Sequence, residues 1–289
     1  MYDYLLNLEN KTMEELRLEL NSLKIDAKSI GLNIDDCQRP TSELCQVIGL
    51  IPNTVDTIFL RASSPGSLAN DRLTAIMKAI NSASGIDLRS NNFGNKRPYD
   101  VVKTLKATSE NVLILNLRSN NFGSPRCTEF AVMLDAIQES VIYLCLSVNR
   151  LGYKTTPELI LAFNSLKESL KTLDLSGNFF DTKTVKELTE LCAALPKGLE
   201  RLILRSNGFK SSADLITALA VLPSVVKVDL SGNELSLSAL EEIYASHPNL
   251  KESINIKSTP NSGRPLQFFA KNDTTSQDST VVKDPIAQP

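Results

Sequence analysis

Short segments in which hydrophobic and polar residues alternate recur along most of the chain. Six of them share the pattern Leu-x-Leu-x-x-Asn, with Ile or Val replacing Leu in places, and begin at positions 86, 115, 144, 173, 202 and 228. Weaker copies begin at 32, 58 and 254, so successive copies are 26 to 29 residues apart. Alternation with a period of two is typical of a short strand with one buried face. The spacing therefore predicts a repeat protein in which each repeat contributes one strand.

The Asn that closes each strong copy predicts a turn out of the strand. An Asn side chain can both donate to and accept from backbone groups, so it can close the same turn in every repeat. The six residues are Asn91, Asn120, Asn149, Asn178, Asn207 and Asn233. In the weaker copies this position falls on Cys37, Ser63 and Thr259. Atypical repeats are expected where a stack of repeats ends and faces water.

The segments between the strands predict helices, because each opens with a capping residue or with a proline in its first turn. Three examples are Ser124-Pro125 before 127–137, Thr156-Pro157 before 158–166, and Ser212 before 213–222. Strand, turn and helix in series give an α/β fold with a parallel sheet on one side and helices on the other. The apolar residues that follow the Asn are expected to fill the core under the helices: Phe93, Phe122, Phe180, Phe209 and Leu235.

These repeats resemble the leucine-rich repeat family, in particular its longer repeats, which are similar to those of ribonuclease inhibitor. The resemblance covers about residues 30–259 and implies a curved solenoid of about nine strands, with the parallel sheet on the concave face and the helices on the convex face. Residues 1–29 are predicted to form a helical N-terminal cap, and the polar residues 260–289 a disordered C-terminal tail. The chain resembles the leucine-rich-repeat effectors that Legionella-type intracellular bacteria deliver into host cells, in its repeated LRSNNFG segments at 88–94 and 117–123, its cysteine usage and its short polar tail.

The outward positions of the predicted strands are the ones directly before, between and after the two apolar residues of each copy. They place Arg61, Arg89 and Arg118 in one column across neighbouring strands. Like charges at this spacing repel, so the column requires compensation by Asp87, by solvent, or by carboxylates of a partner. The alternative is that the arginines record only the duplication of a repeat. We predict a partner protein with an acidic patch.

An apolar centre of Ile114, Tyr143 and Cys145 is predicted beside these arginines. Tyr and Arg are enriched in the energetic centres of protein interfaces, and we expect Tyr143 to fill a pocket of the partner. The full predicted partner-binding set is Phe59, Arg61, Asp87, Arg89, Ile114, Asn116, Arg118, Tyr143, Cys145, Arg201 and Arg205.

Composition narrows the functional classes. The net charge of the 289 residues is −2, which disfavours nucleic acid as a partner. The chain has one His and no Trp, and its five cysteines are odd in number and form no CxxC pair, which favours free thiols in a reducing compartment. The N-terminus lacks the features of a signal peptide, and no apolar run is long enough to span a membrane. We expect a cytoplasmic protein, located in the host cytoplasm if it is delivered there without a cleaved signal peptide.

Catalysis is not expected. Cys145 and His247 are predicted on repeats three strands apart, about 14 Å, on opposite sides of the strands, so they cannot form a nucleophile–base pair. No motif for a cofactor, a metal ion or a phosphate is present. The sequence thus predicts a non-enzymatic protein-binding module, monomeric on its own, that uses its concave face. Its partner is a host protein or another bacterial effector, and the resemblance suggests inhibition of a partner enzyme. The alternative is a scaffold that recruits a host complex through its convex face or its tail, and the tail is also a candidate export signal.

Overall fold

The computed structural model describes residues 3–8, 10–23, 27–34, 39–61 and 70–246. All of them belong to one compact unit, Tyr2–Ser258. The strand expected at 254, the tail 260–289, and the turn residues Cys37, Ser63 and Thr259 lie outside the described residues.

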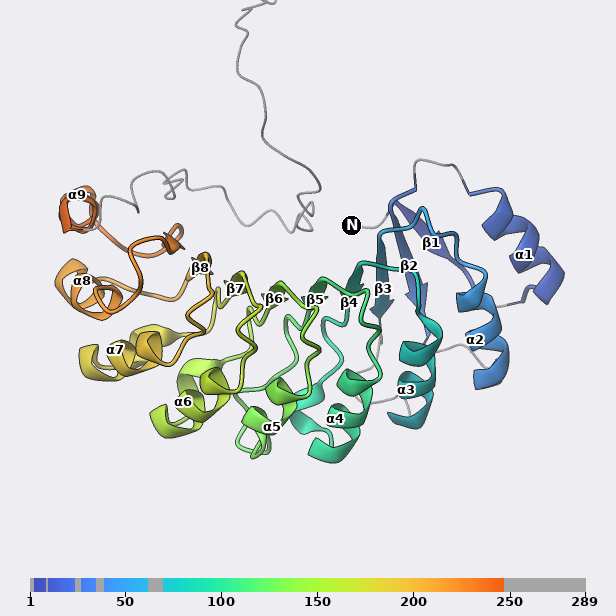
Figure 1. The fold of residues 1–289 in the computed structure, drawn as a ribbon, viewed down its shortest axis with the longest axis horizontal. Coiled ribbons are helices and arrows are strands. Elements are labelled where there is room, and N and C mark those ends of the chain that lie inside the picture. Colours follow the sequence, from blue (N-terminus) through green and yellow to red (C-terminus); the bar gives the residue numbers. More distant parts are fainter. Residues whose placement is uncertain (1–2, 9, 24–26, 35–38, 62–69, 247–289) are drawn as a thin grey trace, which may run out of the picture. The chain divides into compact units, whose positions relative to one another are not determined.

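The described strands form one parallel sheet in which each strand pairs with the next along the chain (Figure 1). There are nine of them in this part of the chain: β1 (Tyr4–Leu6), β2 (Ser29–Asn33), β3 (Thr57–Arg61), β4 (Gly85–Asp87), β5 (Ile114–Asn116), β6 (Tyr143–Cys145), β7 (Thr172–Asp174), β8 (Arg201–Ile203) and β9 (Lys227–Asp229). Sequential parallel pairing confirms the predicted stack of repeats.

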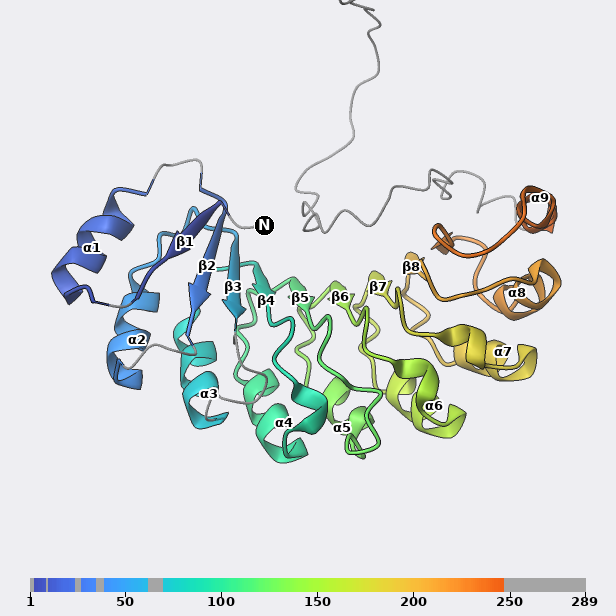
Figure 2. The same cartoon turned by 180° about the vertical axis from the view of Figure 1, so that it is seen from behind.

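A helix follows each strand. The helices are α1 (Met13–Asn21), α2 (Thr41–Gly49), α3 (Asn70–Ala79), α4 (Pro98–Lys106), α5 (Phe130–Asp135), α6 (Thr156–Asn164), α7 (Val185–Ala193), α8 (Ser212–Leu219) and α9 (Leu237–Ser246), with short 3₁₀ turns η1 (Phe93–Asn95), η2 (Leu151–Tyr153) and η3 (Phe180–Thr182). Within this unit the strands line the inner, concave side and the helices the outer, convex side, as the two opposite views show (Figures 1 and 2). The predicted α/β solenoid is confirmed.

The register agrees with the sequence pattern from β3 onward, where Leu115 pairs with Ile86 on one side and with Leu144 on the other. At β2 the predicted frame was wrong by two residues, because Ile30 and not Leu32 pairs with Ile58. Positions 30, 32 and 34 are all apolar and buried, so a shift of two keeps the same face inside. The corrected frame removes Cys37 from the position of the turn Asn.

The N-terminal segment holds a strand as well as the expected helix. Tyr4 and Leu6 of β1 pair with β2, and Leu6 is fully buried. Thr12 caps α1 in a reciprocal pair with Glu15, and the apolar face of this helix buries Leu16. Residues 1–29 therefore include a further strand–helix unit, paired edge to edge with the repeats.

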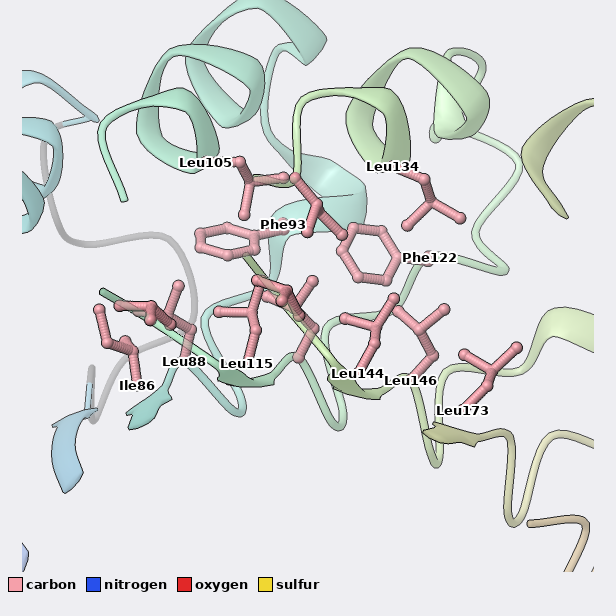
Figure 3. Packing of buried hydrophobic residues seen from close by; sticks show 14 of the residues in the cluster. Ile86, Leu88, Phe93, Leu105, Leu115, Phe122, Leu134, Leu144, Leu146 and Leu173 are labelled. Atoms are coloured by element: carbon pink, nitrogen blue, oxygen red, sulfur yellow. The ribbon is translucent and has the colours of Figure 1, made fainter. Parts of the chain in front are cut away.

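Phenylalanines fill the space between the sheet and the helices. Phe93 and Phe122 lie above the row of strand leucines and below Leu105 and Leu134 of the helices (Figure 3), with ring centroids 6.5 Å apart. Phe180 and Phe209 are also buried and Leu235 partly so, which confirms the predicted filling of the core.

The helices begin close to the predicted positions with one exception. Ser211 Oγ accepts from the backbone N–H of Asp214 and caps α8, and Thr155 caps α6, each one residue before the predicted cap. By contrast, α5 begins only at Phe130, because the residues after Ser124-Pro125 form turns first.

Candidate functional site

The turn asparagines bind to the repeats on both sides as well as to their own. Asn149 is fully buried, and its amide nitrogen donates to the carbonyls of Leu146 (2.9 Å) and Leu117 (3.0 Å). Its amide oxygen accepts from the backbone N–H of Asn120 at 2.7 Å, and its own N–H donates to Asn178 at 2.8 Å. The continuous ladder fixes the spacing of the strands and hence of the side chains on their outward face.

We define the sheet face as the outward residues of β3–β9 and, for β4–β9, also the residue two positions after the end of each strand. Its middle column lies on this face but is buried throughout: Phe59, Asp87, Asn116, Cys145, Asp174, Ile203 and Asp229. Strands lie about 4.8 Å apart, so longer side chains of the flanking columns cover the middle one. Four residues predicted to bind a partner, namely Phe59, Asp87, Asn116 and Cys145, therefore have almost no surface to offer.

Asp87 neutralises Arg89, which was one of the three predicted compensations for the arginine column. Arg89 Nε donates to both carboxylate oxygens of Asp87, at 2.9 and 2.8 Å. Asn116 donates to the same carboxylate at 2.9 Å, and the guanidinium lies 5.6 Å from the centre of the Phe59 ring. Arg205 is held in the same way by Asp229, with Nε at 2.6 Å and Nη2 at 2.5 Å from one carboxylate oxygen.

Three cations of the sheet face are exposed and take part in no ion pair among the described residues: Arg118, Arg201 and Lys227. We call them the free cations. Arg118 makes one side-chain hydrogen bond, from Nη1 to Ser147 Oγ at 3.2 Å. Lys227 was not predicted as a site residue, although it occupies the same column as Arg201. Arg61 ends β3, and its side chain lies outside the described part.

Tyr143 does not extend toward solvent as predicted. Its ring is half-buried, and its hydroxyl is fully buried without a hydrogen-bond partner among the described residues. Burial above all, and then the nearby Asp174 and Cys145, raise the pKa of this phenol. A hydroxyl enclosed in this way cannot fill a pocket of a partner unless the ring rotates out.

The apolar centre lies closer to the start of the strands than predicted. Ile114 is half-buried beside Tyr143, and the residues before them, Leu113 and Ile142, are 41% and 40% exposed. Their backbones are joined by a hydrogen bond of 2.9 Å from Ile142 N–H to the Leu113 carbonyl. From here on, the apolar centre denotes Leu113, Ile114, Ile142 and Tyr143, without the buried Cys145. The sequence pattern missed Leu113 and Ile142 because both precede the alternating segment.

Cys145 is a buried structural thiol. Its sulfur lies 3.1 Å from Ser147 Oγ and 3.5 Å from a carboxylate oxygen of Asp174, and burial raises its pKa. Burial likewise raises the pKa of Cys127 to about 11 and that of Cys192 to about 12. Thiols of this kind are protonated at neutral pH and are poor nucleophiles.

Neither a metal site nor a membrane span is found in the described ranges. No group of three or more His, Cys, Asp or Glu side chains there is placed to hold a metal ion. The described helices include none with the length and apolar character that crossing a bilayer requires. His247 lies outside the described residues.

The comparisons with known proteins agree with the repeat pattern. The Leucine Rich Repeat family model matches residues 169–191. The leucine-rich repeat-containing protein LegL7 from Legionella pneumophila is 28% identical and superposes with a TM-score of 0.74 over 86% of this chain and 79% of its own. This likeness confirms the predicted resemblance to leucine-rich-repeat proteins of Legionella.

Two further solved structures are more distant. The tropomodulin C-terminal domain of Caenorhabditis elegans is 10% identical, with a TM-score of 0.33 over 64% of this chain and 95% of its own. A chain of the yeast Rad7–Elc1 complex is 14% identical, with a TM-score of 0.46 over 87% of this chain and 70% of its own. No curated protein matches the chain in sequence.

Proposed function

We propose that this leucine-rich-repeat protein is a non-enzymatic module that binds another protein on its sheet face. Stacked repeats generally present an extended concave surface to a partner. The observation that carries the proposal is the set of free cations on this face, since Arg118, Arg201 and Lys227 are exposed without a carboxylate partner among the described residues. Cations placed in this way favour a partner with an acidic patch.

The apolar centre supplies the second part of the contact. Leu113 and Ile142 are exposed directly before the adjacent strands β5 and β6, next to the half-buried Ile114 and Tyr143. Interfaces draw most of their affinity from a few apolar or aromatic anchors surrounded by polar residues. We therefore place the energetic centre at Leu113 and Ile142, at the start of the strands, and Arg118, just past the opposite end of β5, sets the orientation of an acidic partner.

The resemblance to leucine-rich-repeat effectors extends the proposal to delivery into a host cell and to inhibition of the bound enzyme, whether a host protein or a second effector.

A specific observation favours the rival function of a scaffold that binds through its convex face. Tyr99 of α4, Val132 of α5 and Leu161 of α6 are 73%, 50% and 64% exposed on neighbouring helices. The two functions differ in the surface that a partner needs.

The test is a quantitative pull-down with a matched pair of variants, followed by titration of the purified partner. The face variant, Arg118→Glu/Arg201→Glu, reverses two free cations without breaking an ion pair of the described structure. The control, Lys78→Glu/Lys197→Glu, makes the same change of charge at exposed positions on α3 and in the loop before β8. We expect the face variant to lose the partner and the control to keep it, and the partner's own activity then tests inhibition. Capture that survives in the face variant but is lost in Leu161→Asp would establish the convex scaffold instead.

A further inference from the structure

The five turns after β4 to β8 repeat one backbone conformation in which two residues have positive φ, and the turn after β9 has one such residue. These residues stand directly before and directly after the turn Asn. Most are of the kinds that tolerate this conformation: Ser90 and Asn92, Ser119 and Asn121, Ser206 and Gly208, Gly177, and Gly232. Three are not: Val148 at 57°, Arg150 at 62° and Phe179 at 62°.

A positive φ is costly for a β-branched or bulky side chain. The neighbouring turns show that Ser and Asn fit the same two positions, so the fold itself does not require Val, Arg or Phe there. Strained residues of this kind persist mainly where the side chain has a task. All three lie in the turns after two adjacent strands, β6 and β7.

One of the three strained residues, Phe179, forms an exposed aromatic pair with Tyr153. Phe179 and Tyr153 stack with ring centroids 5.5 Å apart and an angle of 23° between their planes, and they are 44% and 62% exposed. Val148 is 39% exposed and packs over Gly177. A Cβ atom added at Gly177 would lie 3.3 Å from a Val148 methyl carbon. Exposed apolar side chains thus lie in both turns.

Tyr153 also borders a cleft between the turns after β5 and β6, lined by Asn121, Pro125, Arg150, Lys154 and Glu158. The charge of Lys154 is already engaged, because its side chain is buried and its Nζ donates to the Cys127 carbonyl at 2.6 Å and to Glu158 at 3.2 Å. Arg150 is exposed and forms no ion pair within the described ranges. The cleft thus offers one available positive charge beside a flat aromatic surface.

We propose that Val148, Arg150, Tyr153 and Phe179, the turn site, bind a short peptide segment of a partner protein that carries an aromatic or aliphatic side chain next to a carboxylate. The apolar side chain packs against the Tyr153–Phe179 pair, and the carboxylate pairs with Arg150. The turn site lies at the edge of the repeats and uses no residue of the sheet face, so it stands independently of the proposed function. A negative net charge makes a nucleic acid a poor occupant, even though aromatic rings and arginine also stack on bases.

The key reagent is a turn variant that replaces each strained residue with the residue at the same position of the turn after β5. Val148→Ser and Arg150→Asn copy Ser119 and Asn121, and Phe179→Asn copies Asn121 at the same position. Because these changes relieve backbone strain, we expect the unfolding temperature to be at least that of the wild type while binding is lost. Tyr153→Ala is a second variant, which removes the exposed ring without altering a strained position.

The experiment selects peptides from a random display library on the immobilised full chain and counter-selects on the turn variant. We expect the enriched peptides to combine Asp or Glu with an adjacent aromatic or aliphatic residue. A labelled enriched peptide should bind the turn variant and Tyr153→Ala about 30-fold more weakly, the loss that corresponds to one anchor residue. The face variant should bind this peptide like the wild type.

Several results would overturn the proposal. They are the absence of an enriched peptide family, enriched peptides without an acidic residue, and equal binding by the turn variant. Displacement of the peptide by a single-stranded oligothymidylate would assign the site to nucleic acid. A wild type that is dimeric in light scattering beside a monomeric turn variant would assign it to a second copy of the chain.

Discussion

The guanidinium of Arg89 lies over the carboxylate of Asp87, two residues earlier in the chain, and donates to both of its oxygens at 2.9 and 2.8 Å. Asp87 is 1% exposed, so this ion pair is part of the framework of the sheet face more than of its binding surface. Arg118 occupies the same column one strand further on, yet it is exposed and pairs with no carboxylate among the described residues. Two arginines with the same local sequence thus have different roles.

We predict that Arg89→Ala lowers the free energy of unfolding by about 2 kcal/mol, because it leaves the Asp87 carboxylate buried without its cation. Arg118→Ala should change it by less than about 0.5 kcal/mol. Urea denaturation of the two variants measures the difference. The double variant Asp87→Ala/Arg89→Ala should be less unstable than the sum of its single changes. Equal losses at Arg89 and Arg118 would contradict the assignment.

The fold could be predicted from the sequence because the period and the turn Asn fix the register without tertiary information. Where the Asn is missing the frame is ambiguous. In β2 the alternation of Ile30, Leu32 and Ile34 fits two frames that bury the same face. In β1 the segment that begins at Tyr4 also lacks the Asn, so the strand escaped notice although Leu6 and Leu8 are both buried.

The outward face of the strands could be predicted from the sequence, but the burial of the side chains on that face could not. Alternation indicates which side of a strand faces outward. It cannot show that the Arg89 side chain folds back onto Asp87 or that the Tyr143 hydroxyl is buried. Those outcomes depend on side-chain conformations across neighbouring strands. The turn site had a signal in the sequence: Val148 stands where the other strong copies have Ser or Gly, and Phe179 stands where three of them have Asn or Gly.

The Asn ladder should be most sensitive at its centre. Asn149→Ala leaves two backbone N–H groups and three carbonyls of a buried turn without this partner, and we expect a loss of about 3 kcal/mol in the free energy of unfolding. Asn233→Ala removes equivalent bonds at a half-buried position, where water can replace them, and should cost less. Denaturant titration of both variants tests the order, and an equal or larger loss at Asn233 would contradict it.

Gly152 is required by the close approach of two turns. A Cβ atom at this position would lie 2.1 Å from the carbonyl oxygen of Phe179 in the next repeat, and backbone cannot move away as a side chain can. We expect Gly152→Ala to destabilise the protein by about 2 kcal/mol. The matched control is Gly49→Ala at the end of α2, where an added Cβ would meet no atom within 4 Å apart from its own helix backbone, and thermal unfolding should show no loss for it.

The buried thiols should resist alkylation in the folded protein. At about pH 8 a free Cys is partly ionised, whereas burial raises the pKa of Cys127 to about 11 and that of Cys192 to about 12, and raises the pKa of Cys145 as well. Iodoacetamide followed by peptide mass spectrometry should modify the two fully buried thiols, Cys127 and Cys145, slowly in the native state and rapidly in urea. Fast labelling of Cys145 in the native protein would show that the middle column of the sheet face is accessible to the reagent, contrary to its burial.

Acid should weaken the hydrogen bonds by which Glu187 connects α6 and α7. Its carboxylate accepts from Thr156 Oγ1 at 2.5 Å, from Thr184 N–H at 2.9 Å and from Thr184 Oγ1 at 2.9 Å, and these bonds lower its pKa from an ordinary value of 4.5 to about 2. Because the pKa is lower in the folded state, the stabilisation is complete above about pH 4.5 and is lost as the pH falls toward about 2. Urea midpoints of the wild type and of Glu187→Gln, compared at about pH 6 and about pH 3, should therefore differ more at the higher pH. A difference that grows on acidification would mean that the carboxylate is not held by these bonds.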